Sequence, residues 1–203
     1  SLIQVSLELT TDMEPDWQKG AAKLYVHKLY DKVRKNRGLS NDVDLYKNLY
    51  GFVKDLVDKN LYGKYILENY SKEDIDELEK EIKPERDFLF TYSGIKLLGE
   101  RYLVENFNRE VLELPQQMFM GIAMHLAIPE KKEKRLYYAK RFYDVLSSLK
   151  ATMATPTMSN ARKPFYQLSS CFIDTVNDSL KGIYKSLDNF SEVSKFGGGM
   201  GIY

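Results

Sequence analysis

The sequence predicts a mainly helical N-terminal domain over residues 1–150, followed by the beginning of an α/β domain in residues 151–203. Apolar residues recur at helical spacing through most of the first 150 residues. Beyond Ala151, threonines around Pro156 raise the strand propensity. An extended run, a helix and a glycine turn then follow in that order, which is the order of a βαβ unit.

Capping signals and proline positions set the bounds of the expected helices. Pro15 suits a first helical turn and Gly38 suits a stop, so a helix is expected between them. Ser71 and Asp74 form a capping-box pattern, and Pro84 interrupts the helix that follows. The expected helices cover residues 15–37, 42–61, 71–82, 92–104, 115–127 and 132–149.

The α/β part is expected to hold one strand, one helix and the start of a second strand. Residues 167–175 form an extended run, and Asp178 suits the N-cap of a helix over residues 179–195. Three glycines at 197–199 predict a turn that leads into residues 200–203.

Composition argues against several classes of function. Thirty Lys and Arg residues against 29 Asp and Glu residues give a net charge of +1, which offers no field for a polyanion or a membrane surface. No apolar stretch approaches the ~20 residues of a spanning helix, and the acidic N-terminus does not resemble a signal peptide. We therefore expect no nucleic-acid partner, no membrane association and a cytoplasmic location. His27 and His125 have no partners at ligand spacing, so no metal site is expected.

Four short segments carry residues suited to chemistry, and each also has a plain structural interpretation. They are residues 154–160 (ATPTMSN), 167–171 (QLSSC), 177–180 (NDSL) and 195–201 (KFGGGMG). Hydroxyls beside a proline turn could bind a phosphate or a sugar, but such turns are common. The lone Cys171 cannot form an intrachain disulfide, and a free cysteine is more often a small buried apolar residue than a redox centre. A helix start can hold an anion or simply be capped, and the glycine run matches neither the P-loop nor the dinucleotide spacing.

In their order and separation, the four segments resemble the large catalytic (alpha) subunit of ribonucleotide reductases, of the class I type. Similar upstream motifs are Arg86-Asp87-Phe88, Tyr92-Ser93-Gly94, Leu98, Arg101-Tyr102-Leu103 and Pro115-Gln116. The resemblance runs from about Trp17 onward, and its most specific motifs lie after residue 150. It implies that residues 1–150 are the family's helical N-terminal domain, with residues 1–30 as one candidate for the end of an ATP-cone region. Residues 151–203 would begin the family's ten-stranded α/β barrel, which is incomplete in this chain.

The resemblance also implies roles for particular residues. Cys171 matches one of the two cysteines that supply the electrons when a thiyl radical drives reduction of the ribose 2′ carbon. The positions that match substrate contacts are Thr155, Ser170 and Gly199. The positions that match the effector site for a deoxynucleoside triphosphate are Asp178, Ser179 and Leu180, with Lys195 as a further contact to the phosphates. The family's second reducing cysteine, thiyl-radical cysteine and radical-transfer tyrosines would all lie beyond Tyr203, so the chain would need a C-terminal part for activity.

The implied partners follow from the same resemblance. They are a ribonucleotide substrate, a dNTP or ATP effector, the C-terminal remainder of the catalytic subunit, a second large subunit in a homodimer, a radical-generating small subunit, and a thioredoxin- or glutaredoxin-type reductant. No cofactor is expected to bind this chain directly. The radical would come from a metal-containing small subunit or, alternatively, from adenosylcobalamin. Effector and substrate loops are expected to lie close together, which would give allosteric control.

The sequence leaves several alternatives open. The chain could be a fragment of the enzyme or one half of a split enzyme, and its substrate could be a diphosphate or a triphosphate. An overall-activity ATP site is not predicted. A non-catalytic nucleotide-binding module and a helical interaction scaffold are the alternatives to an enzyme.

Overall fold

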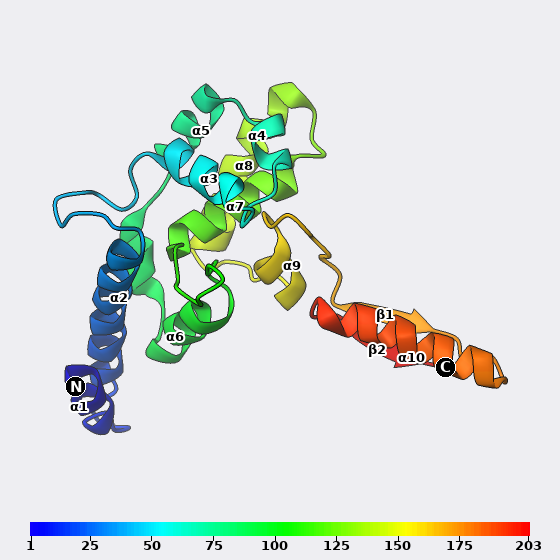
Figure 1. The fold of residues 1–203 in the computed structure, drawn as a ribbon. Coiled ribbons are helices and arrows are strands. Elements are labelled where there is room, and N and C mark those ends of the chain that lie inside the picture. Colours follow the sequence, from blue (N-terminus) through cyan, green and yellow to red (C-terminus); the bar gives the residue numbers. More distant parts are fainter.

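Helices α1 to α9 form one body, and a unit of two strands and a helix projects from it (Figure 1). The computed structural model describes residues 1–203 in full. The helices of the body are α1 (Leu2–Glu8), α2 (Asp16–Asn36), α3 (Leu49–Asp58), α4 (Tyr65–Asn69), α5 (Lys72–Glu79), the 3-10 helix η1 (Pro84–Leu89), α6 (Tyr92–Arg101), α7 (Pro115–Ala127), α8 (Lys132–Ser147) and α9 (Thr155–Asn160). The projecting unit consists of β1 (Cys171–Asp174), α10 (Leu180–Lys195) and β2 (Gly199–Ile202).

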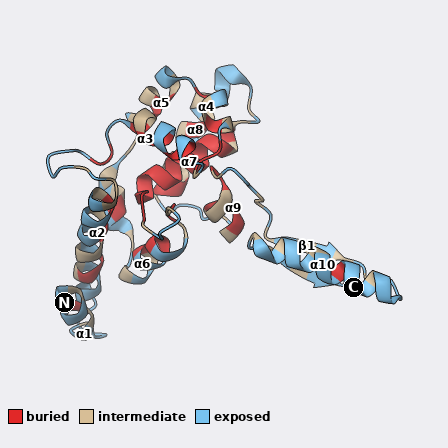
Figure 2. Ribbon diagram, in the orientation of Figure 1, coloured by how far each residue is buried: buried red, intermediate tan, exposed pale blue.

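Helix α7 is the centre of the body. Its sequence, PQQMFMGIAMHLA, is apolar on nearly every face, and a helix of that kind must be surrounded by other elements. All of its residues except Leu126 are buried, as the red colour of α7 in Figure 2 shows. Helix α8 packs along it, and Tyr70 donates a hydrogen bond of 2.7 Å to the Met124 carbonyl. A cluster of 34 buried apolar residues forms the core of the body around this helix.

Most of the expected helices are confirmed, because their ends are set by local signals. Helix α7 has the expected bounds, and α2, α5, α6 and α8 lie within the expected ranges. The capping box at the start of α5 is present, with Ser71 and Asp74 each accepting from the other's backbone N–H. The helix expected over residues 42–61 is wrong in its first part. Asn48 takes a left-handed conformation with φ of 58° and caps α3 at the Gly51 N–H, so the helix begins only at Leu49.

The threonine-rich residues after Ala151 do not form a strand, although their strand propensity is raised. Thr155–Asn160 form the short helix α9, and Pro156 lies in its first turn, where a missing N–H costs no hydrogen bond. The Thr157 hydroxyl donates to the Leu168 carbonyl at 3.1 Å. This side-chain bond folds the chain after α9 back against the helix.

The expected βαβ unit is confirmed. Strands β1 and β2 are parallel, with Cys171 opposite Gly199 and Asp174 opposite Ile202. Helix α10 connects them and lies along the pair (Figure 1). The Asn189 side chain donates to the Asp174 carboxylate at 3.1 Å, which ties α10 to β1.

A fully buried ion pair joins α9 to the rest of the body. Both side chains of Arg162 and Glu113 are 0% exposed, and Arg162 Nη2 lies 2.6 Å from Glu113 Oε2. All five N–H donors of the guanidinium have acceptors, which are the two Glu113 oxygens and the carbonyls of Met158, Ala161 and Tyr102. Glu113 also accepts from the Tyr62 hydroxyl and the Val104 N–H. The pair is therefore completely hydrogen-bonded, which is the condition under which a buried charge is tolerated.

A second buried acid, Asp87, has only uncharged partners. Its carboxylate is 0% exposed and accepts from the hydroxyls of Tyr30, at 2.6 Å, and of Tyr46. The Gln116 amide donates to the other carboxylate oxygen at 2.8 Å. Burial raises the pKa of Asp87 to about 6, although the three hydrogen bonds act to lower it.

We predict that Asp87 makes the body more stable in mild acid than at neutral pH. A carboxyl pKa that is higher in the folded state than in the unfolded state contributes stability below the unfolded value, near 4, and loses it as the pH rises through about 6. The full contribution is on the order of 2–3 kcal/mol, of which about half is lost between pH 5 and pH 7.5. Urea unfolding of the wild type and of Asp87→Asn, each at pH 5 and pH 7.5, would measure it. The same pH dependence in both proteins would contradict the assignment.

Candidate functional site

Three of the predicted site residues meet where the βαβ unit joins the body. The parallel register places Cys171 opposite Gly199, and the Gly199 N–H donates to the Ser170 carbonyl at 2.7 Å. Ser170 Oγ lies 3.5 Å from Cys171 Sγ. Cys171 is exposed, so the interpretation of this cysteine as a small buried apolar residue is wrong.

The three glycines of the turn differ in whether, and for what reason, the fold requires the absence of a side chain. Gly197 has φ of +82°, a conformation that other residues rarely adopt. A Cβ on Gly198 would lie 2.7 Å from the Val193 side chain and 2.9 Å from the ring of Phe172. A Cβ on Gly199 would meet only the Ser170 carbonyl at 3.6 Å, which is ordinary contact. Folding therefore requires glycine at 197 and 198, whereas at 199 a Cβ would fit without a clash.

Thr155 lies in α9, the helix of the body that contacts this junction. It is the first residue of α9, and its Oγ1 lies 3.2 Å from the Tyr102 hydroxyl. Further along the same helix, the Asn160 side chain donates to the carbonyls of Gln167, at 2.9 Å, and Phe196, at 3.1 Å. These two carbonyls belong to the segment before Ser170 and to the turn before Gly199. Helix α9 thus holds together the two chain segments that carry the other predicted substrate contacts.

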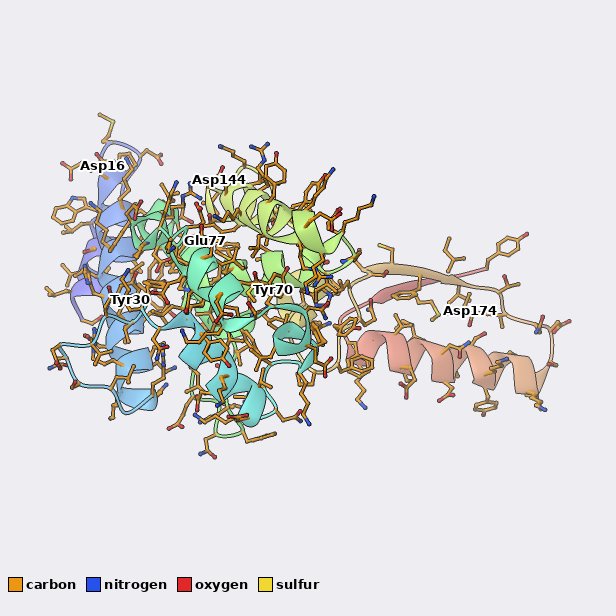
Figure 3. All side chains as sticks on the ribbon, turned by 90° about the horizontal axis from the view of Figure 1, so that it is seen from above. Asp16, Tyr30, Tyr70, Glu77, Asp144 and Asp174 are labelled. Atoms are coloured by element: carbon orange, nitrogen blue, oxygen red, sulfur yellow. The ribbon has the colours of Figure 1, made fainter.

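The predicted effector residues lie at the opposite end of the projecting unit. Asp178, Ser179 and Leu180 are exposed and precede or begin α10, at the end of the unit that is far from the body (Figure 1). Figure 3 shows Asp174, the last residue of β1, well away from the labelled residues of the body. The expectation that substrate and effector segments lie close together is not met within this chain, because α10 separates them.

The structure corrects the predicted cap of α10 and places Lys195 at the other end of that helix. The N-cap of α10 is Ser179, whose Oγ accepts from the Gly182 N–H at 3.0 Å, so the prediction that Asp178 is the cap is wrong. Ser179 has the extended conformation of an N-cap, with φ of −161° and ψ of 150°. Lys195 ends α10, and fifteen helical steps place it about 22 Å from Leu180. The structure does not bring Lys195 together with the other three effector residues.

Three residues near the site received no role from the sequence. Asn160 stands within the 154–160 segment, but nothing marked its amide as the link to two other segments. Tyr102 belongs to a motif that indicated the family only, and Arg162 lies between the motifs. The sequence signal available for Arg162 was its charge, two positions after the hydroxyl-rich segment 154–160. Its buried partner, Glu113, is 49 residues away in the sequence.

Two further properties of the chain concern membranes and metals. None of its helices combines the length and the apolar character that crossing a bilayer requires. No group of three or more His, Cys, Asp or Glu side chains in residues 1–203 is arranged to hold a metal ion.

Comparison with known proteins divides the chain into a helical part and a barrel part between residues 166 and 169. Residues 88–166 match the family described as ribonucleotide reductase, all-alpha domain, and residues 169–203 match ribonucleotide reductase, barrel domain. The ribonucleoside-diphosphate reductase subunit alpha of Treponema pallidum is 47% identical over 206 residues, which cover 100% of this chain and 23% of that protein. The Helicobacter pylori subunit alpha is 39% identical, over 99% of this chain and 24% of its own length. Subunit alpha of Escherichia coli ribonucleoside-diphosphate reductase 1 is 33% identical, over 90% of this chain and 23% of its own length.

These matches place the helical body and the parallel βαβ unit of this chain in the ribonucleotide reductase family. The chain belongs to the family of the large, or alpha, subunits of these enzymes. It spans about a quarter of the length of the curated relatives named above.

We predict that the cap of α10 depends on Ser179 and not on Asp178. Ser179→Ala removes the acceptor for the Gly182 N–H and should lower the free energy of unfolding by about 1 kcal/mol. Asp178→Ala, the matched control, should change it by less than about 0.5 kcal/mol, since the side chain is exposed and does not cap the helix. Urea denaturation of the two variants would distinguish them, and a larger loss for Asp178→Ala would contradict the assignment.

We also predict that the Cys171 thiol is accessible in the folded protein. Because Cys171 is exposed, iodoacetamide should alkylate it under native conditions at a rate within about tenfold of the rate in urea. Mass spectrometry of samples quenched over time would give both rates. A thiol that reacts only after unfolding would show that the cysteine is covered.

Proposed function

We propose that the protein to which this chain belongs reduces ribonucleoside diphosphates to deoxyribonucleoside diphosphates. The observation that carries the proposal is the exposed Cys171 thiol in register with Gly199 and beside the Ser170 hydroxyl. The relatives' names support the substrate class, because each is called a ribonucleoside-diphosphate reductase.

In the proposed reaction Cys171 is one of two reducing thiols. The bond between the ribose 2′ carbon and its hydroxyl breaks, and the oxygen leaves as water. Two thiols lose two electrons and two protons and become a disulfide, which balances the reduction of the carbon. The second thiol has to come from outside this chain, since Cys171 is its only cysteine. An exposed position suits a sulfur that must approach a second sulfur closely.

We propose that the substrate lies across the junction between the body and the βαβ unit. Ser170 and Thr155 offer hydroxyls that donate to and accept from a sugar or a phosphate. Gly199 has no side chain, so a ligand can approach its backbone more closely than another residue would allow.

We propose that a deoxynucleoside triphosphate, or ATP, binds at the far end of α10 and controls the choice of substrate. Asp178, Ser179 and Leu180 are exposed there, next to the N-terminal N–H groups of a 16-residue helix. Lys195 can contribute only through a second subunit, because α10 holds it about 22 Å away from Leu180.

The proposed partners follow from the exposed surface and from the family. Helix α10 exposes five apolar side chains, by 40–77%, which suits packing against a second large subunit; they are Leu180, Ile183, Tyr184, Leu187 and Phe190. The remaining proposed partners are the C-terminal part of the subunit, a metal-containing radical-generating small subunit, with adenosylcobalamin as the alternative radical source, and a thioredoxin- or glutaredoxin-type reductant. The proposed location is the cytoplasm.

We predict that Cys171→Ser in the full-length subunit abolishes the formation of deoxynucleotide, because a serine cannot enter a disulfide. Turnover of a ribonucleoside diphosphate would be measured with the radical-generating partner and a dithiol reductant. Ser169→Ala is the matched control, since this exposed neighbouring hydroxyl has no assigned role, and it should keep turnover within about twofold of the wild type.

Continued turnover of the Cys171→Ser variant with a dithiol would remove the redox assignment. If the wild-type subunit binds nucleotides but forms no deoxynucleotide with any radical source, a non-catalytic nucleotide-binding module becomes the better interpretation.

A further inference from the structure

Helix α9 needs outside support to hold Thr155 in place. It has only six residues, and a helix of that length is not stable by itself. A threonine in a helix also divides between two side-chain rotamers, so its hydroxyl direction is not fixed by the backbone. The position of the Thr155 hydroxyl is therefore decided by contacts with other parts of the body.

Arg162 supports the C-terminal end of α9. Its Nη1 donates to the carbonyl of Met158, at 2.9 Å, and to that of Ala161, at 3.0 Å. Carbonyls in the last turn of a helix have no intrahelical partner, so the guanidinium caps the helix from within the core. Two of its remaining donors bind Glu113, two residues before the start of α7, which anchors the cap to the centre of the body.

Tyr102 connects the same arginine to the first residue of the helix. The Tyr102 carbonyl accepts from Arg162 Nη2 at 3.0 Å, and the Tyr102 hydroxyl lies 3.2 Å from Thr155 Oγ1. Arg162 thus holds Tyr102 through the Tyr102 backbone carbonyl, and the Tyr102 hydroxyl contacts the Thr155 side chain. Arg162 and Tyr102 together hold α9 at both of its ends.

Gly121 of α7 shows that this arrangement is closely fitted. A Cβ at this position would lie 2.7 Å from Arg162 Cδ and 3.0 Å from the Tyr62 hydroxyl. The arginine can therefore enter the core only where α7 lacks a side chain. The left-handed backbone of Arg162, with φ of 80°, turns the chain so that its side chain enters the core.

From these contacts we propose that Tyr102 and Arg162 are positioning residues for the ribonucleotide: Tyr102 directs the Thr155 hydroxyl, and Arg162 fixes both Tyr102 and the end of α9. The inference rests on the proposed function, in which Thr155 contacts the substrate. Neither positioning residue touches the substrate itself.

The first test uses Tyr102→Phe in the full-length subunit, which removes one hydroxyl and leaves the ion pair intact. Equilibrium binding of cytidine diphosphate should weaken about 2- to 12-fold, the range that corresponds to one lost hydrogen bond, and KM should rise in parallel. The kcat, the affinity for the dNTP effector and the Tm should stay close to the wild type. A general structural defect would alter those three quantities as well.

A double-mutant cycle then asks whether Tyr102 acts through Thr155. Thr155→Ala should weaken cytidine diphosphate binding, and adding Tyr102→Phe to it should weaken binding no further, because the hydroxyl that Tyr102 directs is already absent. Full additivity of the two changes, or wild-type binding by Tyr102→Phe alone, would overturn the role of Tyr102.

Arg162→Lys tests the arginine. Lysine keeps the charge opposite Glu113 but lacks the planar fork of five donors, so it cannot also cap α9 and hold Tyr102. The backbone amides of α9 should lose protection against hydrogen exchange, and cytidine diphosphate should bind more weakly. Unchanged protection and binding would overturn the role of Arg162. If this variant does not fold, the Tyr102 cycle decides the proposal.

The binding measurement separates this inference from the proposed reaction. Weaker binding by Tyr102→Phe in a subunit that forms no deoxynucleotide would support positioning and contradict the reaction. Turnover by the wild type, with unchanged binding in Tyr102→Phe, would overturn positioning and leave the reaction standing.

Discussion

The buried ion pair between Arg162 and Glu113 is the interaction on which the arrangement of this chain depends. It joins segments that lie far apart in the sequence, since its hydrogen bonds also reach Tyr62, Tyr102 and Val104. Removing one partner of a fully buried pair leaves an uncompensated charge and typically costs about 3–5 kcal/mol. The pair is tolerated because every donor of the guanidinium and both carboxylate oxygens have partners. The network also favours a single arrangement of these side chains. An arrangement that left one of the buried polar groups unpaired would be less stable than an apolar core.

The consequence for function is that the candidate site is divided between two parts of the fold. The body supplies Thr155 through α9, and the βαβ unit supplies Ser170, Cys171 and Gly199. Because Asn160 bonds to the segment before that unit and to the turn before its second strand, α9 connects the two parts of the site. The candidate effector residues are at the far end of α10. Any coupling between the two ends must therefore pass along α10, β1 and β2 or through residues of another chain.

Features set by neighbouring residues could be predicted from the sequence, and features set by distant contacts could not. Pro115 marks the start of α7 and Ser71 with Asp74 marks the start of α5, because caps and prolines act within one helical turn. The left-handed Asn48 that shortens α3 was not predicted. At the start of α10 the sequence pattern predicted Asp178 as the cap, and the structure shows that the next residue, Ser179, is the cap.

The sequence by itself determined that the chain is a helical body followed by a βαβ unit, and it marked Cys171 and the neighbouring hydroxyls as the candidate chemistry. These conclusions depend on periodicity, capping and motif order, all of which are local. Only the tertiary structure decided that the threonine-rich segment is a helix and that Arg162 pairs with Glu113. Each of these depends on contacts or distances across many residues. Such contacts exist only after the hydrophobic core has brought the segments together, so no short stretch of sequence contains them.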